Sequence, residues 1–182
     1  MVILGIDPGL ASTGYGVVEK KEGLLRPLGF GGIDTSPREP LSSRLDKIYS
    51  EVRELIERYH PDLLVLEELF FNKNARSAMV VGQARGGIIL AAAHAGIGVE
   101  EYTPLQVKQT LVGHGRADKR QVEYMVRTLL HIEGDIGSSH ASDALALAVC
   151  HAHSERMRGR LDEALGGKAV QKKPAHKKRT VR

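Results

Sequence analysis

The feature that most constrains the fold of this chain is a change in hydrophobic periodicity near residue 40. Before that point, segments 2–7, 14–20 and 25–35 are rich in β-forming residues and are separated by short turns. This pattern predicts an antiparallel meander of three strands. After it, apolar residues from Leu41 to Ile56 recur at intervals of three and four, which is the spacing of an amphipathic helix.

Helical and extended patterns alternate along the rest of the chain. Pro61 ends the first helix, and we expect further strands over 62–67 and 99–102. Further helices are expected over 75–95, 104–112, 119–130 and 139–158. Three strands followed by alternating helices and strands indicate an α/β fold, with a mixed five-stranded sheet and helices on both faces. We expect residues 1–158 to form one domain.

The net charge of +4 arises from the C-terminal end of the chain. Seven of the 26 Lys and Arg residues lie in 166–182, which contains no acid, so the remainder carries a net charge of −3. Residues 159–182 are therefore expected to form a basic, disordered tail. The tail either attracts phosphate loosely or only keeps the chain soluble. Any nucleic-acid contact in the domain must come from local basic patches.

Cysteine usage and hydropathy indicate the compartment. Cys150 is the only cysteine and lies among Ala and Leu, which indicates a buried thiol and no internal disulfide. No apolar run reaches the roughly 18 residues of a membrane span. The N-terminus enters a strand pattern directly, without the pattern of a secretory signal. We therefore expect a cytoplasmic protein.

Carboxylates stand at the ends of two expected strands. Asp7 ends the first strand, directly before Pro8, and Glu67 ends the strand over 62–67. Sites in such sheets lie at the C-terminal ends of central strands, so we expect Asp7 and Glu67 to be neighbours in space. Taken alone, Asp7 is equally well explained as a turn-forming residue. Glu68 points to the opposite face from Glu67 and should stay outside the site.

The last expected helix brings a second pair of candidate ligands. His140 and Asp143 are three residues apart and share a helical face among small apolar neighbours. Burying both is costly unless they are paired or bind a metal. A helix-dipole role would explain Asp143 but not His140. Three carboxylates and an imidazole suit Mg²⁺ or Mn²⁺, and two such ions can hydrolyse a phosphodiester.

Around these residues the sequence closely resembles the RuvC family of crossover-junction (Holliday-junction) endodeoxyribonucleases, over nearly the whole chain to about Arg158. The matching blocks, in order, are GIDPGLASTGYGVV, LEELFFNKNARSA, GQARG, QVKQTLVGHGRADK, MVRTLL and HASDALA. The resemblance implies a ribonuclease-H-like fold, a homodimer, Mg²⁺-dependent symmetric nicking of four-way DNA junctions in recombination and repair, and a branch-migration motor as partner. It also implies catalytic and metal-binding roles for Asp7, Glu67, His140 and Asp143. The third position is Asp in some family members and His in others, so His140 leaves the choice between Mg²⁺ and Mn²⁺ open.

The resemblance further implies contacts with DNA. It assigns Phe70 to the junction centre, although a Phe there could also pack in the core. It favours Lys119, and less firmly Lys108, as contacts close to the scissile phosphate; both could instead be solvated helix ends. Arg76 and Arg116 are weaker candidates for contacts with the DNA backbone.

The long helix expected over 75–95 has two readings. It is rich in Ala, Val and Gly, and Gly82, Gly86 and Gly87 would permit close approach of another helix. Such a helix is either a central core element or, as the resemblance implies, a dimer contact, which suits a near-twofold junction.

Three other functions share some of these sequence features. An actin-like or sugar-kinase-type ATPase shares a short GID turn but needs a duplicated domain and a second glycine-rich turn, for which 182 residues leave no room. A non-catalytic junction-binding protein would keep the basic residues but would not need the acidic set. A single-strand ribonuclease or exonuclease could have the same fold, and the substrate would distinguish it.

Overall fold

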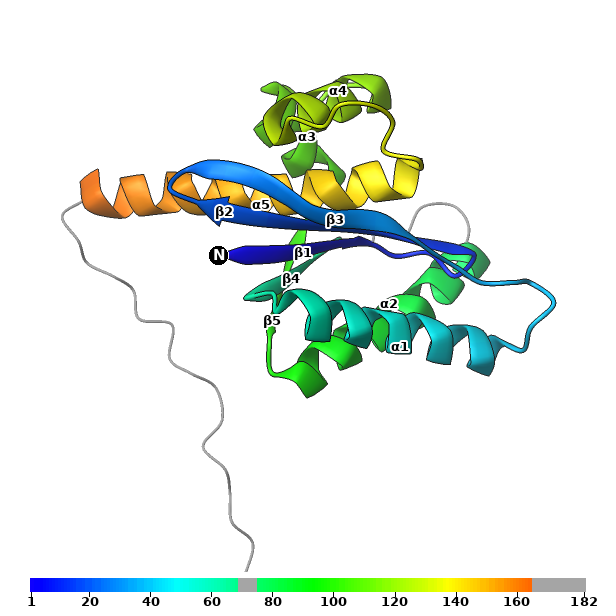
Figure 1. Ribbon diagram of the computed structural model, residues 1–182. Coiled ribbons are helices and arrows are strands. Elements are labelled where there is room, and N and C mark those ends of the chain that lie inside the picture. The colour runs from blue at the N-terminus through cyan, green and yellow to red at the C-terminus, as the bar shows by residue number, and fades with distance from the viewer. Residues whose placement is uncertain (69–74, 165–182) are drawn as a thin grey trace, which may run out of the picture.

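Figure 1 shows the computed structural model, which describes residues 1–68 and 75–164. Its centre is a five-stranded sheet with the strand order β3-β2-β1-β4-β5. The strands are β1 (Val2–Asp7), β2 (Ser12–Lys21), β3 (Leu24–Asp34), β4 (Leu63–Glu67) and β5 (Gly98–Tyr102). The first three form the predicted antiparallel meander, whereas β1 pairs with β4, and β4 with β5, in parallel. The predicted mixed five-stranded sheet is confirmed.

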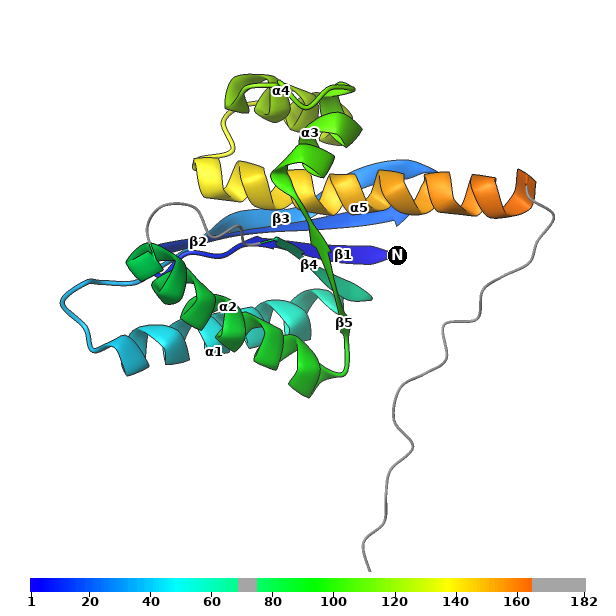
Figure 2. The same ribbon diagram turned by 180° about the vertical axis from the view of Figure 1, so that it is seen from behind.

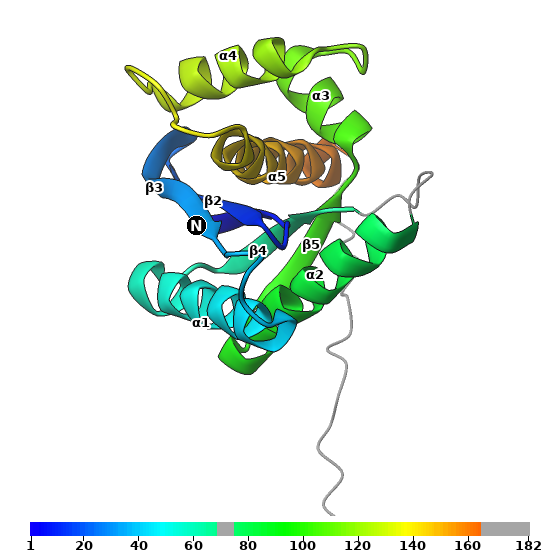
Figure 3. The ribbon, with the colours of Figure 1, turned by 90° about the vertical axis from the view of Figure 1, so that its right-hand side faces the viewer.

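Helices cover both faces of this sheet, as predicted. They are α1 (Leu41–Tyr59), α2 (Ala75–Ala95), α3 (Pro104–Val112), α4 (Lys119–Leu130) and α5 (Ser139–Ala164). Figures 1 and 2 show α1 and α2 on one face and α5 on the other, and the end-on view in Figure 3 shows α3 and α4 stacked outside α5. Helix α5 continues to Ala164, past the predicted end at Arg158. Residues 165–182 of the expected tail lie outside the described residues.

Alternating side chains of the strands build a core on each face of the sheet. On β1, Leu4 and Ile6 pack toward α1 and α2, whereas Ile3 packs on the α5 side. Cys150 is fully buried on α5, as predicted. Among the described residues, no helix is long and apolar enough to cross a membrane.

Local capping fixes where the helices that frame the site begin. The Ser138 hydroxyl accepts a hydrogen bond from the Ala141 amide at 3.1 Å, so Ser138 is the N-cap of α5. Asp118 and Gln121 form a reciprocal capping box that starts α4 at Lys119. Both caps stand next to residues of the candidate site.

Helix α5 lies very close to the sheet because β1 and β2 carry glycines beneath it. We call Gly5, Gly14 and Gly16 the glycine seam. A methyl group added at Gly5 would overlap the carbonyl oxygen of Ala144, and one at Gly14 would overlap that of His140. The seam therefore sets the depth at which α5 packs.

The close approach that the glycines of α2 would permit is not found among residues 1–68 and 75–164. A Cβ at Gly82 or Gly86 would meet no atom within 4 Å, and one at Gly87 would only just reach the Leu45 carbonyl oxygen of α1, at 4.0 Å. Gly82 and Gly86 face open space because the apolar contacts of α2 with the sheet use other residues, including Ala84 and Ile88.

Candidate active site

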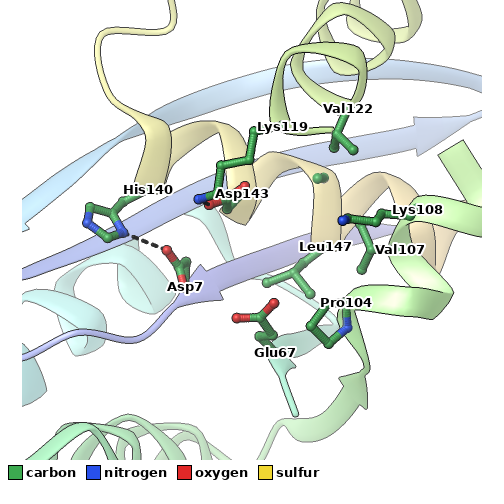
Figure 4. Close-up of a pocket in the computed structure, with 11 residues that line it drawn as sticks. Asp7, Glu67, Pro104, Val107, Lys108, Lys119, Val122, His140, Asp143 and Leu147 are labelled. Carbon is green, nitrogen blue, oxygen red and sulfur yellow. Dashed lines mark hydrogen bonds and ion pairs between the residues drawn. The ribbon is translucent and has the colours of Figure 1, made fainter. Parts of the chain in front are cut away.

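A pocket of about 440 Å³ opens where β1 and β4 end beneath α5 (Figure 4). Its charged lining consists of Asp7, Glu67, His140, Asp143, Lys108 and Lys119. The pocket thus contains all four ligands proposed from the sequence and both lysines. Pro104, Val107 and Leu147 form an apolar wall beside them.

The sheet topology brings the two strand-end acids together. β1 and β4 are parallel neighbours, with Ile6 opposite Leu66, so Asp7 and Glu67 leave the sheet at the same edge. Glu68 is exposed and does not line the pocket, as the alternation of side chains along a strand requires.

Each of two carboxylates has a partner within the pocket. The Nδ1 atom of His140 lies 2.7 Å from Oδ2 of Asp7, and Nζ of Lys119 donates to Oδ2 of Asp143 at 2.9 Å (Figure 4). His140 and Asp143 therefore reach the same pocket from one face of α5, with Asp7 between His140 and the end of β4. Lys119 comes from α4 across the mouth of the pocket.

Burial and mutual repulsion make Glu67 and Asp7 hard to ionise. Burial raises the pKa of Glu67 from its ordinary 4.5 to about 7, and the negative charges of Asp7 and Asp143 add to the effect. Burial also raises the pKa of Asp7, although the hydrogen bond from His140 opposes this. The pKa of Lys119 is raised by its contact with Asp143. The two ammonium groups of Lys108 and Lys119 do not balance three carboxylates, so the pocket favours added positive charge.

The donor set fits a hard divalent cation in its chemistry, because it combines carboxylate oxygens with one imidazole nitrogen. As the side chains stand, no three His, Cys, Asp or Glu donors within the described part of the chain are grouped closely enough to hold an ion. His140 contacts Oδ2 of Asp7, and Lys119 contacts Oδ2 of Asp143. A cation must compete with these two contacts for the same oxygens.

The predicted DNA contacts are placed only in part. Lys108 and Lys119 line the pocket, whereas Arg116 is exposed in the loop before α4 and lies outside the pocket lining. Phe70 lies outside the described residues, and so does the side chain of Arg76, which belongs to the first turn of α2.

Arg85 is a residue near the site that the sequence reasoning missed. It lies on α2 and is buried, and its Nη1 donates to the backbone oxygen of Glu67 at 2.6 Å. Its Nη2 forms an ion pair with Glu101 on β5 at 2.5 Å. One sequence feature could have drawn attention to Arg85: it is an arginine on the apolar side of a core helix, next to the buried Ala84.

Comparison with known proteins gives a consistent result. Residues 3–151 match the family described as "Crossover junction endodeoxyribonuclease RuvC". A relative of that name from Moorella thermoacetica is 52% identical over 166 residues, which cover 91% of this chain and 99% of the relative.

Solved structures agree with the sequence comparison. The structure of Thermus thermophilus RuvC in complex with a Holliday junction substrate superposes with a TM-score of 0.83 at 42% identity, over 87% of this chain and 96% of that one. The yeast mitochondrial Holliday junction resolvase Ydc2 superposes with a TM-score of 0.69 over 89% of this chain and 82% of that one. At 11% identity, the yeast protein supports the fold alone.

Proposed function

The chain belongs to the RuvC family of crossover junction endodeoxyribonucleases, and we propose that it resolves four-way DNA junctions at the pocket between β1, β4 and α5. The observation that carries this proposal is the convergence of Asp7, Glu67, His140 and Asp143 in one pocket, at the place where this fold puts its sites. Family membership sets aside the ATPase alternative. The acidic pocket argues against a protein that only binds junctions.

We propose that these four residues hold two divalent cations, Mg²⁺ or Mn²⁺. Bound there, such ions supply Lewis acidity at the phosphodiester and lower the barrier by several kcal/mol. Asp7 is oriented by His140, and Glu67 by the end of β4. Pro104, Val107 and Leu147 give the pocket one apolar wall.

The basic residues of the pocket suit a phosphate backbone. The Lys119 side chain is 77% exposed, so its ammonium can move from Asp143 to a DNA phosphate when a cation takes the carboxylate. Lys108 approaches from α3 on the other side of the pocket mouth (Figure 4). Contacts from Phe70, Arg76 and Arg116 remain predictions drawn from the family.

We also propose a homodimer in which two copies meet through α2. Met79 and Leu90 are 67% and 49% exposed, and Gly82 and Gly86 face open space on the same helix. A twofold dimer would present two pockets to a near-twofold junction. Delivery of junctions by a branch-migration motor, and a cytoplasmic location, are proposals that rest on the family resemblance and on the expectations from the sequence.

The proposal is tested with a synthetic four-way junction and a linear duplex of the same sequence, each incubated with Mg²⁺ or Mn²⁺. Paired, symmetric cuts are expected in the junction and none in the duplex. Asp7→Asn should slow junction cleavage about a thousandfold, because several kcal/mol of transition-state stabilisation depend on the ions.

Glu68→Gln is the control for this test, since Glu68 is an exposed acid outside the pocket lining. It should cleave like the wild type. Equal cutting of duplex and junction, or full activity in Asp7→Asn, would contradict the proposed function.

A further inference from the structure

The carbonyl group of Glu67 lies at the end of β4, where the backbone hydrogen bonds between β4 and β1 end. The amide of Glu68 donates to the carbonyl oxygen of Tyr102 in β5 at 2.9 Å. Successive residues of a parallel strand direct their backbone groups to opposite neighbours, so the carbonyl of Glu67 faces β1 instead. Its ladder partner must therefore come from β1.

The register of β1 places a proline at the position of that partner. Ile6 stands opposite Leu66, so the next amide on β1 that could reach the Glu67 carbonyl is that of residue 8. Residue 8 is Pro8, which has no N–H group. The Nη1 of Arg85 takes this place and donates to the Glu67 carbonyl at 2.6 Å.

Arg85 is well suited to hold this carbonyl in one place. Its side chain is 10% exposed, and its second nitrogen pairs with Glu101 at 2.5 Å, so the planar guanidinium is fixed between two elements. A buried ion pair of this kind is weak evidence for a contribution to stability, because desolvation offsets much of its attraction. Its position directly behind a pocket carboxylate suggests another role.

We propose that Arg85 is a positioning residue, which replaces the hydrogen bond that Pro8 cannot make and thereby fixes the direction in which Glu67 enters the pocket. This inference rests on the proposed function for the role of Glu67. It predicts that losing the guanidinium displaces the Glu67 carboxylate while leaving the DNA-facing lysines in place. Displacement of a reacting group by about 1 Å can slow an enzyme a hundredfold.

The central variant is Arg85→Met, which keeps a long apolar stem and removes both donors. Folding should survive, because the Glu101 side chain is 43% exposed and its charge stays hydrated. The single-turnover cleavage rate of prebound junction should fall about 10- to 100-fold. Junction affinity measured in EDTA should stay within about twofold of the wild type. Arg85→Lys, which retains a cation and a donor, should recover part of the rate.

Lys20→Met is a closely matched control at the far end of the sheet. Lys20 also donates to a backbone carbonyl, that of Ala152 at 2.8 Å, and also pairs with a half-exposed acid, Glu155 at 2.9 Å. Its side chain is 18% exposed. Lys20→Met should cleave junctions at the wild-type rate. If Lys20→Met lost as much of the cleavage rate as Arg85→Met, removal of any buried cation would have the same effect. That result would overturn the positioning role of Arg85.

The second test restores the missing donor. Pro8→Ala supplies an N–H at residue 8, so the double variant Pro8→Ala/Arg85→Met should cleave faster than Arg85→Met. Wild-type cleavage by folded Arg85→Met, or no recovery in the double variant, would overturn the proposal.

A readout independent of cleavage separates this inference from the proposed function. Mg²⁺ should raise the Tm of every folded variant, and Arg85→Met should need about tenfold more Mg²⁺ for half of the rise than wild type or Lys20→Met. If no protein cut junctions but this difference appeared, the proposed function would fail and the positioning role would stand. If Arg85→Met titrated like the wild type, the positioning role would fail.

Discussion

At the scale of single residues, the pocket concentrates more negative charge than its own cations balance. Burial holds the pKa of Asp7 above its ordinary value, and that of Glu67 at about 7. A carboxyl with a raised pKa contributes stability below its unfolded value and loses that contribution as pH rises through its folded value. The metal-free protein should therefore lose stability between pH 4.5 and pH values above 7 because of Glu67.

Glu67→Gln tests this sign directly. In EDTA at about pH 8, the variant should melt a few degrees above the wild type, because it has no buried charge to form. The difference should shrink as pH falls toward 4.5, the ordinary pKa of a Glu carboxyl. Mg²⁺ should raise the Tm of the wild type at about pH 8 more than that of Glu67→Gln.

Thermal unfolding across this pH range is the measurement, with Glu68→Gln as the control for removing a nearby acid. A gap between Glu67→Gln and wild type that stayed constant with pH would contradict the raised pKa of Glu67.

The candidate ligands could be predicted from the sequence because each stands where a local pattern marks it. Asp7 and Glu67 end apolar strands, and His140 and Asp143 share one face of a helix. The role of Arg85 could not be predicted in this way. It depends on a backbone carbonyl brought near by the packing of α2, and on a strand register that no local pattern specifies.

At the scale of elements, the residue at which a helix starts was easier to predict than the distance between that helix and the sheet. Helices α3 and α4 begin and end where expected, because Pro104 and the capping residue Asp118 mark their starts. The glycine seam was not predicted, because close packing of α5 on β1 and β2 is a tertiary contact. Gly14 of the seam lies directly beneath the His140 carbonyl and so limits where His140 can lie.

Gly14→Ala should move the start of α5 and separate His140 from Asp7. The added methyl would overlap the His140 carbonyl, and overpacking of this kind costs about 1–3 kcal/mol. Cleavage should fall well beyond what the loss of stability explains, because a proposed ligand is displaced. Rates measured far below the Tm of both proteins separate the two effects.

Gly32→Ala provides the control, since Gly32 is the direct strand partner of Gly14 on β3. Its added methyl would approach nothing closer than Ser12 Oγ at 3.9 Å. This variant should stay active. If both variants lost activity equally, the role assigned to the seam would be wrong.

At the scale of the whole molecule, the sheet and α5 build one pocket, while the open face of α2 offers a surface for a second copy. Family membership and this surface together motivate the proposed dimer. Two pockets on one dimer would explain how two of the four strands of a junction are cut while the DNA stays bound.

Leu90→Glu should convert the proposed dimer into a monomer, because Leu90 is 49% exposed on α2 and a charge there would be buried on association. Light scattering would report the mass. Cleavage of a supercoiled plasmid that extrudes a junction would report the cuts, since paired cuts give linear DNA and single cuts give nicked circles. The variant should shift the product toward nicked circles.

Leu24→Glu is the control, since Leu24 is 73% exposed on β3, away from α2. It should remain dimeric and give linear product. A wild-type monomer, or a Leu90→Glu variant that stays dimeric, would place the interface elsewhere.

The residues of the active site are far apart in the sequence. Asp7 and His140 are in contact although 133 positions separate them in the sequence. Glu67 lies between them in the sequence, on β4, which pairs with the much earlier β1 and with the later β5. Contacts of such long range form slowly, because closing a long loop costs entropy before the contact is gained. A chain still being synthesised, or cut before α5, has no complete acidic cluster. Nuclease activity should therefore arise only with the finished fold, and the nascent chain should not nick DNA.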